Sequence, residues 1–286
     1  MRTAIVTGGG AGIGRETALL LARDGYRVVI ADIEEDGAHA VAEEILAAGG
    51  RAHPYRLDVA DAAQWGRCAE WVRAEFGAAD VLVNNAGVMD TGGFCETSAA
   101  QWQRTVDIDL MGVIYGARVF ARQMIDAGVR GHIVNVSSAA AFFPAKYIPA
   151  YSSAKAAVLM ASQCLRVELR PKGIGVSAIC PGAIRTDLLA HGERAGLDET
   201  QQAAWRADIG RVQGLAFAGP DKVARAIVRA IRRDHAIVPV NPEAWLGYLT
   251  FRLAPGLVRA VGSVGSLALA DTLLPRVRPV LNRITK

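Results

Sequence analysis

A serine, a tyrosine and a lysine near the middle of the chain have the types and spacing of a proton-transfer site. Tyr151 and Lys155 are four residues apart in a stretch of helical periodicity, so both side chains are expected on one helix face. An ammonium about 5 Å from a phenolate stabilises it by about 3 kcal/mol at an effective dielectric constant of about 20. This interaction lowers the pKa of the phenol toward neutrality and predicts that Tyr151 acts as a general acid or base. Ser138, in a loop after a predicted strand, is expected to hold the substrate oxygen.

Tyrosine–lysine pairs at this spacing are common on protein surfaces, so a second motif decides how the pair is interpreted. Near the N-terminus, an apolar stretch leads into a glycine-rich run that begins Thr7-Gly8 and ends Gly12-Ile13-Gly14. Glycines allow the backbone to turn tightly beside a pyrophosphate, and the following helix offers N–H groups and the positive end of its dipole. A simple tight turn is the alternative. The position at the first strand-to-helix junction favours a dinucleotide site.

The second predicted strand ends in a carboxylate that bears on the choice of dinucleotide. Asp32 stands twenty residues after Gly12, where it can accept hydrogen bonds from both adenosine ribose hydroxyls. Because it would also repel a 2′-phosphate, NAD(H) is predicted over NADP(H). Two alternatives remain open: Asp32 caps the next helix, or Arg15 receives a 2′-phosphate.

The ends of the third and fourth predicted strands supply further candidate cofactor residues. Asp58, followed by Val59, is positioned to bond the adenine amino group. Asn85, Ala86 and Gly87 offer a side-chain amide and small residues that suit a backbone packed against a cofactor. Ligands of open α/β sheets bind at the carboxyl ends of the strands, so all these groups are expected in one crevice.

Short apolar runs alternate with longer stretches of helical period through most of the chain. This alternation predicts a parallel sheet covered by helices on both faces, a doubly wound α/β fold of the Rossmann type with about seven strands. We expect one domain over residues 1–240 and a helical, amphipathic, basic C-terminal extension over residues 241–286. The expected strands are 3–7, 27–31, 52–57, 81–83, 132–135, 174–179 and 236–238, and the expected helices 13–24, 36–47, 62–76, 100–127, 151–169 and 220–233.

In kind, order and spacing, these motifs resemble those of the classical short-chain dehydrogenase/reductase family from Arg2 to about Val240. The resemblance implies a catalytic serine, tyrosine and lysine, with the lysine also holding the nicotinamide ribose. It implies that the segment with Pro181, Gly182, Ile184 and Thr186 closes over the nicotinamide and phosphates. It also implies homodimers or homotetramers formed partly through two long helices.

These features predict an NAD(H)-dependent oxidoreductase that interconverts a secondary alcohol and a ketone. The cofactor carries the hydride, and the protein contributes position and electrostatics. Two alternatives stay open, an NADPH-dependent carbonyl reductase and a dinucleotide-binding sensor without turnover. The intact serine, tyrosine and lysine argue against the sensor.

One position departs from the family pattern. The family usually has an asparagine in a helix ahead of the catalytic serine, and here Asp109 occupies its place. A carboxylate has the same shape but adds a charge that can pair with Lys155, directly or through water. We therefore count Asp109 among the catalytic residues and expect activity to survive with a changed pH profile.

Two segments outside the motifs bear on the substrate and on location. Residues 187–219 are expected to form a substrate-binding loop, and their apolar side chains suggest a lid over a hydrophobic substrate, although ordinary helix packing explains them equally well. The extension mixes apolar, aromatic and basic residues. This mixture fits a helix that covers the pocket or a partner subunit, and it also fits peripheral contact with an anionic membrane.

Charge and cysteine usage exclude several other classes. The net charge of +4 comes from residues 240–286, which hold six basic and two acidic residues without the dense basic run expected for nucleic acid. The four cysteines and five histidines have no metal-ligand spacing, so no metal is expected. A strand-like start at Arg2 and the unpaired cysteines predict a cytoplasmic protein.

Overall fold

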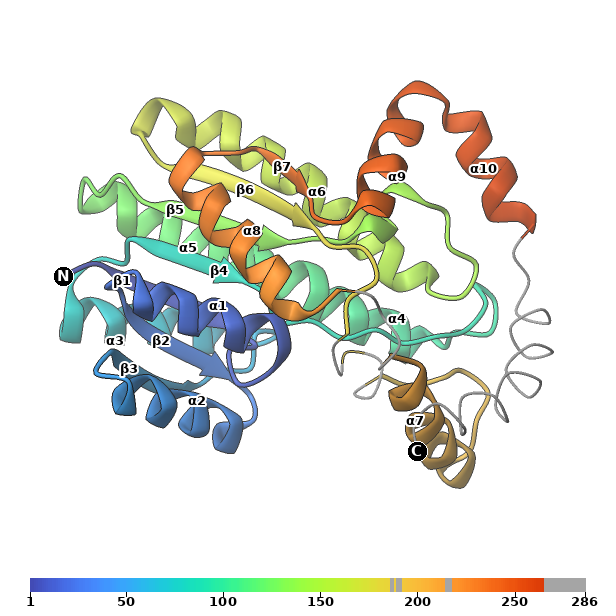
Figure 1. Ribbon diagram of the computed structural model, residues 1–286, viewed down its shortest axis with the longest axis horizontal. Coiled ribbons are helices and arrows are strands. Elements are labelled where there is room, and N and C mark those ends of the chain that lie inside the picture. Colours follow the sequence, from blue (N-terminus) through green and yellow to red (C-terminus); the bar gives the residue numbers. More distant parts are fainter. Residues whose placement is uncertain (186–187, 189–191, 214–217, 265–286) are drawn as a thin grey trace.

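A single parallel sheet forms the centre of the protein (Figure 1). The computed structural model describes residues 1–185, 188, 192–213 and 218–264. The strand order β3-β2-β1-β4-β5-β6-β7 reverses direction between β1 and β4, which confirms the predicted doubly wound topology. The strands are β1 (Thr3–Thr7), β2 (Arg27–Asp32), β3 (Arg51–Arg56), β4 (Val81–Asn84), β5 (His132–Val136), β6 (Gly175–Cys180) and β7 (Ile237–Pro239).

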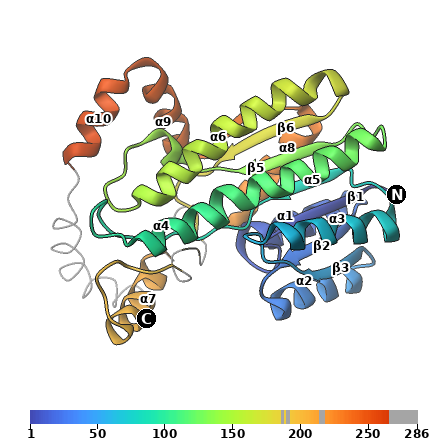
Figure 2. The same ribbon diagram turned by 180° about the vertical axis from the view of Figure 1, so that it is seen from behind.

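Helices cover both faces of this sheet, as crossovers between parallel strands require. One face carries α1 (Gly12–Arg23), α2 (Glu35–Ala47) and α8 (Pro220–Arg233). The other face carries α3 (Ala62–Phe76), α5 (Gly112–Asp126) and α6 (Pro149–Leu169), as seen from behind in Figure 2. Among the described residues, a large apolar core lies on each side of the sheet, and a third, smaller cluster contains Phe142 and Leu159.

The helix expected over residues 100–127 is interrupted, which corrects that prediction. It consists of α4 (Ala99–Val106), a π-helical turn over Asp107–Met111, and α5. A capping box between Ser98 and Gln101 starts α4. Single π turns inside helices are frequent at functional sites, and this one carries the fully buried Asp109.

The predicted C-terminal extension is helical where the structure describes it. It contains α9 (Pro242–Leu253) and α10 (Pro255–Val264), and the rest of the extension lies outside the described residues. The inner face of α9 packs on the short 3₁₀ helix Ala139–Phe142, with the Phe142 and Tyr248 rings 5.3 Å apart. None of the described helices is long and apolar enough to cross a membrane.

At the amino ends of β5 and β6, the sheet buries a histidine. The Nε2 atom of His132 lies 2.8 Å from Ser177 Oγ. Burial lowers the pKa of His132 to about 4, with Asp234 raising it and Arg166 lowering it by smaller amounts. The ring is therefore neutral at physiological pH, where it forms a hydrogen bond inside the sheet.

This histidine should make the fold acid-sensitive. The unfolded chain protonates His132 below about pH 6.5 while the folded chain does not until about pH 4, so unfolding is favoured in that window. The contribution is about 1.4 kcal/mol per pH unit. His132→Gln should remove this part of the pH dependence, as measured by urea unfolding at pH 7, 6 and 5. Parallel curves for the two proteins would contradict the assignment.

Candidate active site

A large cleft lies along the carboxyl ends of the strands. Its volume is 2470 Å³, well above the roughly 300–1,000 Å³ of a site for one drug-sized molecule. A dinucleotide and a second small molecule would both fit. The cleft is lined by loops after β1, β2, β3, β4, β5 and β6 and by residues of α9 and α10.

The glycine-rich turn forms one end of the cleft. Gly8 and Gly12 have φ angles of +60° and +51°, a left-handed conformation that side chains rarely adopt. Both line the cleft together with Ile13. Gly14 does not line it, because it faces the Gly8 carbonyl oxygen, which a Cβ atom would overlap. Gly14 was predicted to contact the cofactor, but its role in the structure is to let the backbone of the turn pack closely against Gly8.

Thr7 also lies behind the cleft wall, where it connects two strands. Its Oγ1 accepts hydrogen bonds from the backbone N–H groups of Asn85 and Ala86 at 2.9 and 3.0 Å. The Asn85 side chain in turn donates to the Thr7 carbonyl at 2.9 Å. These bonds hold the glycine turn against the end of β4. Thr7 is thus a supporting residue and does not line the cleft.

Asp32 lines the cleft at the end of β2 and is held in place by the turn itself. Its Oδ2 accepts a hydrogen bond from Gly10 N at 2.8 Å. Asp32 is not the N-cap residue of α2, which is Glu34, but its Oδ1 accepts a hydrogen bond from Glu34 N at 3.1 Å, so a role at the helix start does not exclude a role in the cleft. Arg15, the other candidate for this region, forms ion pairs with Glu16 and Glu44 and does not line the cleft.

Most of the remaining predicted cofactor residues also line the cleft. Thr186 lies outside the described residues. Gly87 leaves little room: a Cβ atom there would lie 2.7 Å from Asp109 Oδ1 and 3.3 Å from Lys155 Nζ. The predicted residues found in the cleft wall, besides those of the glycine turn and Asp32, are Asp58, Val59, Asn85, Ala86, Gly87, Pro181, Gly182 and Ile184.

Ser138, Tyr151 and Lys155 line the same cleft. Pro149 starts α6 at its first turn, which places Tyr151 and Lys155 on the face toward the end of β5. Ser137 Oγ donates a 2.7 Å hydrogen bond to the Lys155 carbonyl and fastens α6 to that strand end. A side-chain hydrogen bond joins Ser138 to Tyr151.

The predicted lowering of the Tyr151 pKa is not found in the chain without a bound cofactor. Burial raises the pKa of Tyr151 above its ordinary value, the Asp109 carboxylate raises it further, and the bond to Ser138 lowers it. Lys155 Nζ is 5.4 Å from the Tyr151 ring centre. The spacing in the sequence shows only this ammonium. It shows neither the loss of solvation of Tyr151 nor the opposing Asp109 carboxylate, and both raise the pKa.

Asp109 lies directly behind the lysine and does not line the cleft. Its Oδ1 is 3.8 Å from Lys155 Nζ and accepts a hydrogen bond from Val88 N at 2.8 Å. Its Oδ2 is buried without a hydrogen-bond partner among the described residues. Burial raises the pKa of Asp109 to about 6, while Lys155 and the Val88 N–H group lower it. The predicted pairing with Lys155 is therefore a direct ion pair at the edge of contact distance.

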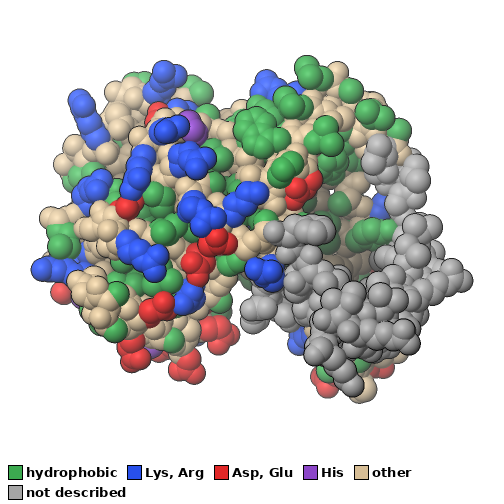
Figure 3. Space-filling model, in the orientation of Figure 1, with side chains coloured by type: hydrophobic (Ala, Val, Ile, Leu, Met, Phe, Trp, Pro, Cys, Tyr) green, Lys and Arg blue, Asp and Glu red, His purple; other side chains and the backbone are tan. Residues whose placement is uncertain are grey.

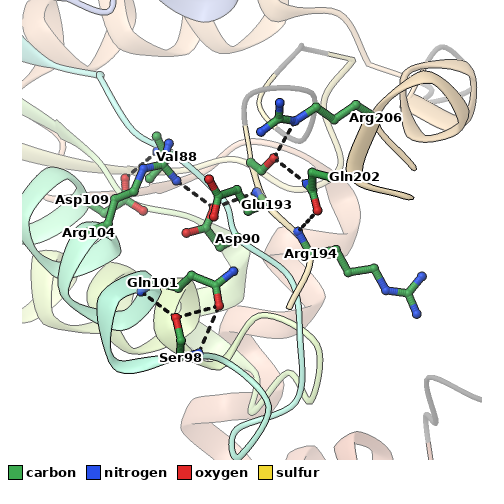
Figure 4. Close-up of polar contacts among 11 residues, drawn as sticks. Val88, Asp90, Ser98, Gln101, Arg104, Asp109, Glu193, Arg194, Gln202 and Arg206 are labelled. Carbon is green, nitrogen blue, oxygen red and sulfur yellow. Dashed lines mark hydrogen bonds and ion pairs between the residues drawn. The ribbon is translucent and has the colours of Figure 1, made fainter. Parts of the chain in front are cut away.

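A second buried carboxylate connects this region to Glu193, in the segment 187–219 that the sequence predicts to bind substrate (Figure 4). Asp90 Oδ1 accepts hydrogen bonds from Arg104 Nη1 at 2.8 Å and from Glu193 N at 2.9 Å. Beside it, Thr91 pairs with Arg194 in a short parallel bridge. The helix α7 (Glu199–Gln213) holds the same loop from its other side, through Gln202.

Sequence reasoning missed this anchor and part of the cleft wall. Asp90 and Glu193 are 103 positions apart in two loops, and neither belongs to a periodic pattern or a motif. Lys222, at the start of α8, and Phe143, before α6, also line the cleft without having been singled out. A signal existed only for Asp90, as a lone acidic residue close after the Asn-Asn-Ala-Gly run.

Fold and site together define an α/β protein with a dinucleotide-type glycine turn and a Ser–Tyr–Lys group in one cleft. A family model described as short chain dehydrogenase matches residues 2–195. The chain belongs to the short-chain dehydrogenase family.

Relatives and solved structures agree with this assignment. The chain is 46% identical over 257 residues to a probable oxidoreductase EphD of Mycobacterium tuberculosis, covering 89% of this chain and 43% of that protein, so it spans less than half of this relative. It is 40% identical over 227 residues to a cis-4-hydroxycyclohexanecarboxylate dehydrogenase of Sinomonas cyclohexanicum, covering 79% and 87%. A short chain dehydrogenase/reductase of Burkholderia phymatum in complex with NAD superposes with a TM-score of 0.81 at 30% identity, covering 91% and 94%.

Removing the Asp90 carboxylate should loosen the substrate-binding loop. In Asp90→Ala, Arg104 and the Glu193 N–H group lose a shared acceptor. We expect KM for the alcohol to rise about tenfold, the effect of about 1.4 kcal/mol, with a much smaller change in kcat. Steady-state kinetics measures both constants.

Asp126→Ala is the matched control, because it breaks an exposed aspartate–arginine pair on α5 away from the cleft. Its kinetic constants should equal those of the wild type. If Asp90→Ala behaves like this control, Asp90 does not position the loop.

Proposed function

We propose that the protein is an NAD(H)-dependent oxidoreductase that interconverts a secondary alcohol and a ketone, with Tyr151 as the general acid or base. The observation that carries the proposal is the position of Ser138, Tyr151 and Lys155 in the same cleft as the glycine turn and Asp32. The residues for proton transfer and the residues for dinucleotide binding therefore line one continuous cleft.

The residues present fit a dinucleotide. At the turn, Cβ atoms on Gly8 and Gly10 would come within 3.0 and 2.9 Å of backbone atoms, so the wall there is bare main chain. Bare N–H groups before α1 suit a pyrophosphate, and Lys222 offers a positive charge at the same wall. Asp58 and Val59 would face the adenine and Asn85, Ala86 and Gly87 the central part, while Pro181, Gly182, Ile184 and Thr186 are assigned to the nicotinamide end.

We assign NAD(H) as the cofactor in preference to NADP(H). The Asp32 carboxylate stands at the end of β2 and is not neutralised by an arginine, since Arg15 is engaged by two glutamates. A 2′-phosphate there would meet a like charge. The related structure from Burkholderia phymatum contains NAD, which agrees with this choice.

The chain's own groups divide the proton chemistry among them. When bound, the nicotinamide supplies the two-electron step by taking or giving hydride. Ser138 orients the substrate oxygen, and Tyr151 accepts or donates the hydroxyl proton. The Lys155 ammonium stabilises the phenolate and would also bind the nicotinamide ribose. Asp109 holds Lys155 in position and sets how strongly its charge acts on Tyr151.

The substrate is proposed to be a largely apolar alcohol, such as a cyclic secondary alcohol. The cleft wall as a whole is mainly apolar. The relative from Sinomonas cyclohexanicum is named for a hydroxycyclohexane substrate, which is consistent with this class. The apolar wall residues near the catalytic group are Val88, Met89, Phe143, Ile148, Leu188, Leu246, Leu257 and Val258.

We further propose that the protein works in the cytoplasm as a homodimer or homotetramer. The partly exposed helices α5 and α6 are the surfaces that the family resemblance assigns to subunit contacts. Met160 and Val167, on α6, are 60% and 77% exposed in the single chain. Burying such side chains in a subunit contact would contribute to assembly.

The function can be tested with a panel of secondary alcohols and both oxidised cofactors. We expect reduction of NAD to exceed that of NADP at least tenfold, with cyclic and apolar alcohols preferred to small polar ones. Tyr151→Phe should lower kcat by a factor of about 10³ without weakening NADH binding. Bound NADH without turnover on any alcohol would instead favour the sensor, and a fully active Tyr151→Phe enzyme would refute the mechanism.

Asp109, which pairs with Lys155, should affect the pH dependence of alcohol oxidation. Because the Asp109 carboxylate raises the pKa of Tyr151, Asp109→Asn should move the alkaline-rising limb of alcohol oxidation to lower pH by about one unit. The folded pKa of Asp109 is raised to about 6, so its stabilising effect is lost as pH rises through that value. Superimposable pH–rate curves would refute this coupling.

A further inference from the structure

The outer face of α9 and the start of α10 is unusually apolar. Six of the twelve strongly exposed large apolar side chains in the described part of the chain lie within thirteen residues here. The space-filling view shows hydrophobic side chains gathered over these two helices (Figure 3). The six, with their exposed fractions, are Trp245 (48%), Leu246 (68%), Leu249 (48%), Phe251 (46%), Leu253 (82%) and Leu257 (56%). We call them the α9–α10 face.

The arrangement reverses the usual pattern of a surface helix. An ordinary surface helix buries its large apolar residues and exposes polar ones. In α9 the buried positions are the small Ala244 and Gly247, which let the helix lie close to Phe143. Trp245, Leu249 and Leu253 are exposed and do not line the cleft, whereas the rings of Tyr248 and Phe251 lie near Phe142. Contiguous exposed apolar surface of this size marks an interaction site.

The charges beside this face are positive. Between Glu243 and Asp271 the sequence has no acidic residue, and the described part of that stretch contains Arg252 and Arg259. Arg252 donates a 2.7 Å hydrogen bond to the Tyr248 hydroxyl and lies over its ring. The Glu243 carboxylate is turned toward the cleft wall, where it accepts a hydrogen bond from Ala183 N.

The face is continuous with the rim of the cleft. Leu246 and Leu257 belong to the exposed face and also line the cleft, together with Thr250 and Val258. Leu249 and Leu253 lie on the outer side and do not line it. An apolar molecule could thus pass from whatever covers the face into the cleft without crossing water.

We propose that the α9–α10 face docks on an anionic lipid bilayer and delivers apolar substrate to the cleft. Tryptophan, phenylalanine and leucine beside arginine are the composition of helices that lie in a membrane interface, where basic groups meet anionic headgroups. A second copy of the chain is the less favoured occupant. In a two-fold contact through this face, Arg252 and Arg259 of each copy would find no acidic residue among residues 244–264 of the other.

Vesicle co-sedimentation of the full chain tests the docking without any turnover, so its result is independent of the proposed reaction. We expect strong binding to phosphatidylcholine vesicles with 30% phosphatidylglycerol, and at least fivefold less binding to pure phosphatidylcholine vesicles. Leu249→Glu/Leu253→Glu should reduce binding to the anionic vesicles at least tenfold while keeping wild-type activity on a short water-soluble alcohol.

The control variant is Leu46→Glu/Phe94→Glu, which makes the same kind of change, from a large apolar side chain to glutamate, at exposed positions on α2 and in the loop after β4. It should bind vesicles like the wild type. Full binding by Leu249→Glu/Leu253→Glu, or no preference for anionic vesicles, overturns the proposal. The proposal is also overturned if the wild type forms an oligomer that does not bind vesicles, and Leu249→Glu/Leu253→Glu is a monomer. The α9–α10 face would then be a subunit interface.

Discussion

Lys155 has an ammonium group almost completely removed from water, and a buried charge of this kind needs compensating partners. The Val136 carbonyl accepts its hydrogen bond at 3.2 Å, and the Asp109 carboxylate stands at 3.8 Å on its other side. Gly87 leaves the space in which these groups meet. The end of β5, the π turn and the loop after β4 must therefore converge on one cation. The position of Tyr151, one helical turn away, follows from the position of Lys155.

The carboxylate at position 109 is costly, because its charge is buried and one oxygen is unpaired among the described residues. Replacing both members of a buried ion pair with neutral groups is often neutral or stabilising, whereas removing only the carboxylate would leave the Lys155 ammonium without this partner. Asp109 counteracts the effect of the Lys155 charge on the pKa of Tyr151. It raises the pKa of Tyr151, whereas a bare lysine would lower it. We interpret the pair as a setting of the proton affinity of Tyr151, at some expense of stability.

Much of the architecture could be predicted because local patterns specify it. Buried parallel strands appear as short apolar runs, and α3 and α8 were predicted with the bounds observed. The π turn escaped prediction because the apolar period continues through it. The pKa of Tyr151 was predicted in the wrong direction, because spacing along a helix reveals one neighbour but neither the desolvation nor a carboxylate from another element. The contact of Asp90 with Glu193 joins two loops far apart in sequence.

That loop contact links the two halves of the cleft. The short segment from Gly87 to Thr91 touches the lysine and its carboxylate at one end and the substrate-binding loop at the other. Val88 N donates to Asp109, and two residues later Asp90 accepts a hydrogen bond from Glu193 N. The two contacts therefore lie within three residues, and a movement at one contact would strain the other. Such a short, hydrogen-bonded connection is stiff. The position of Glu193 is thereby tied to that of Asp109, the carboxylate that pairs with Lys155.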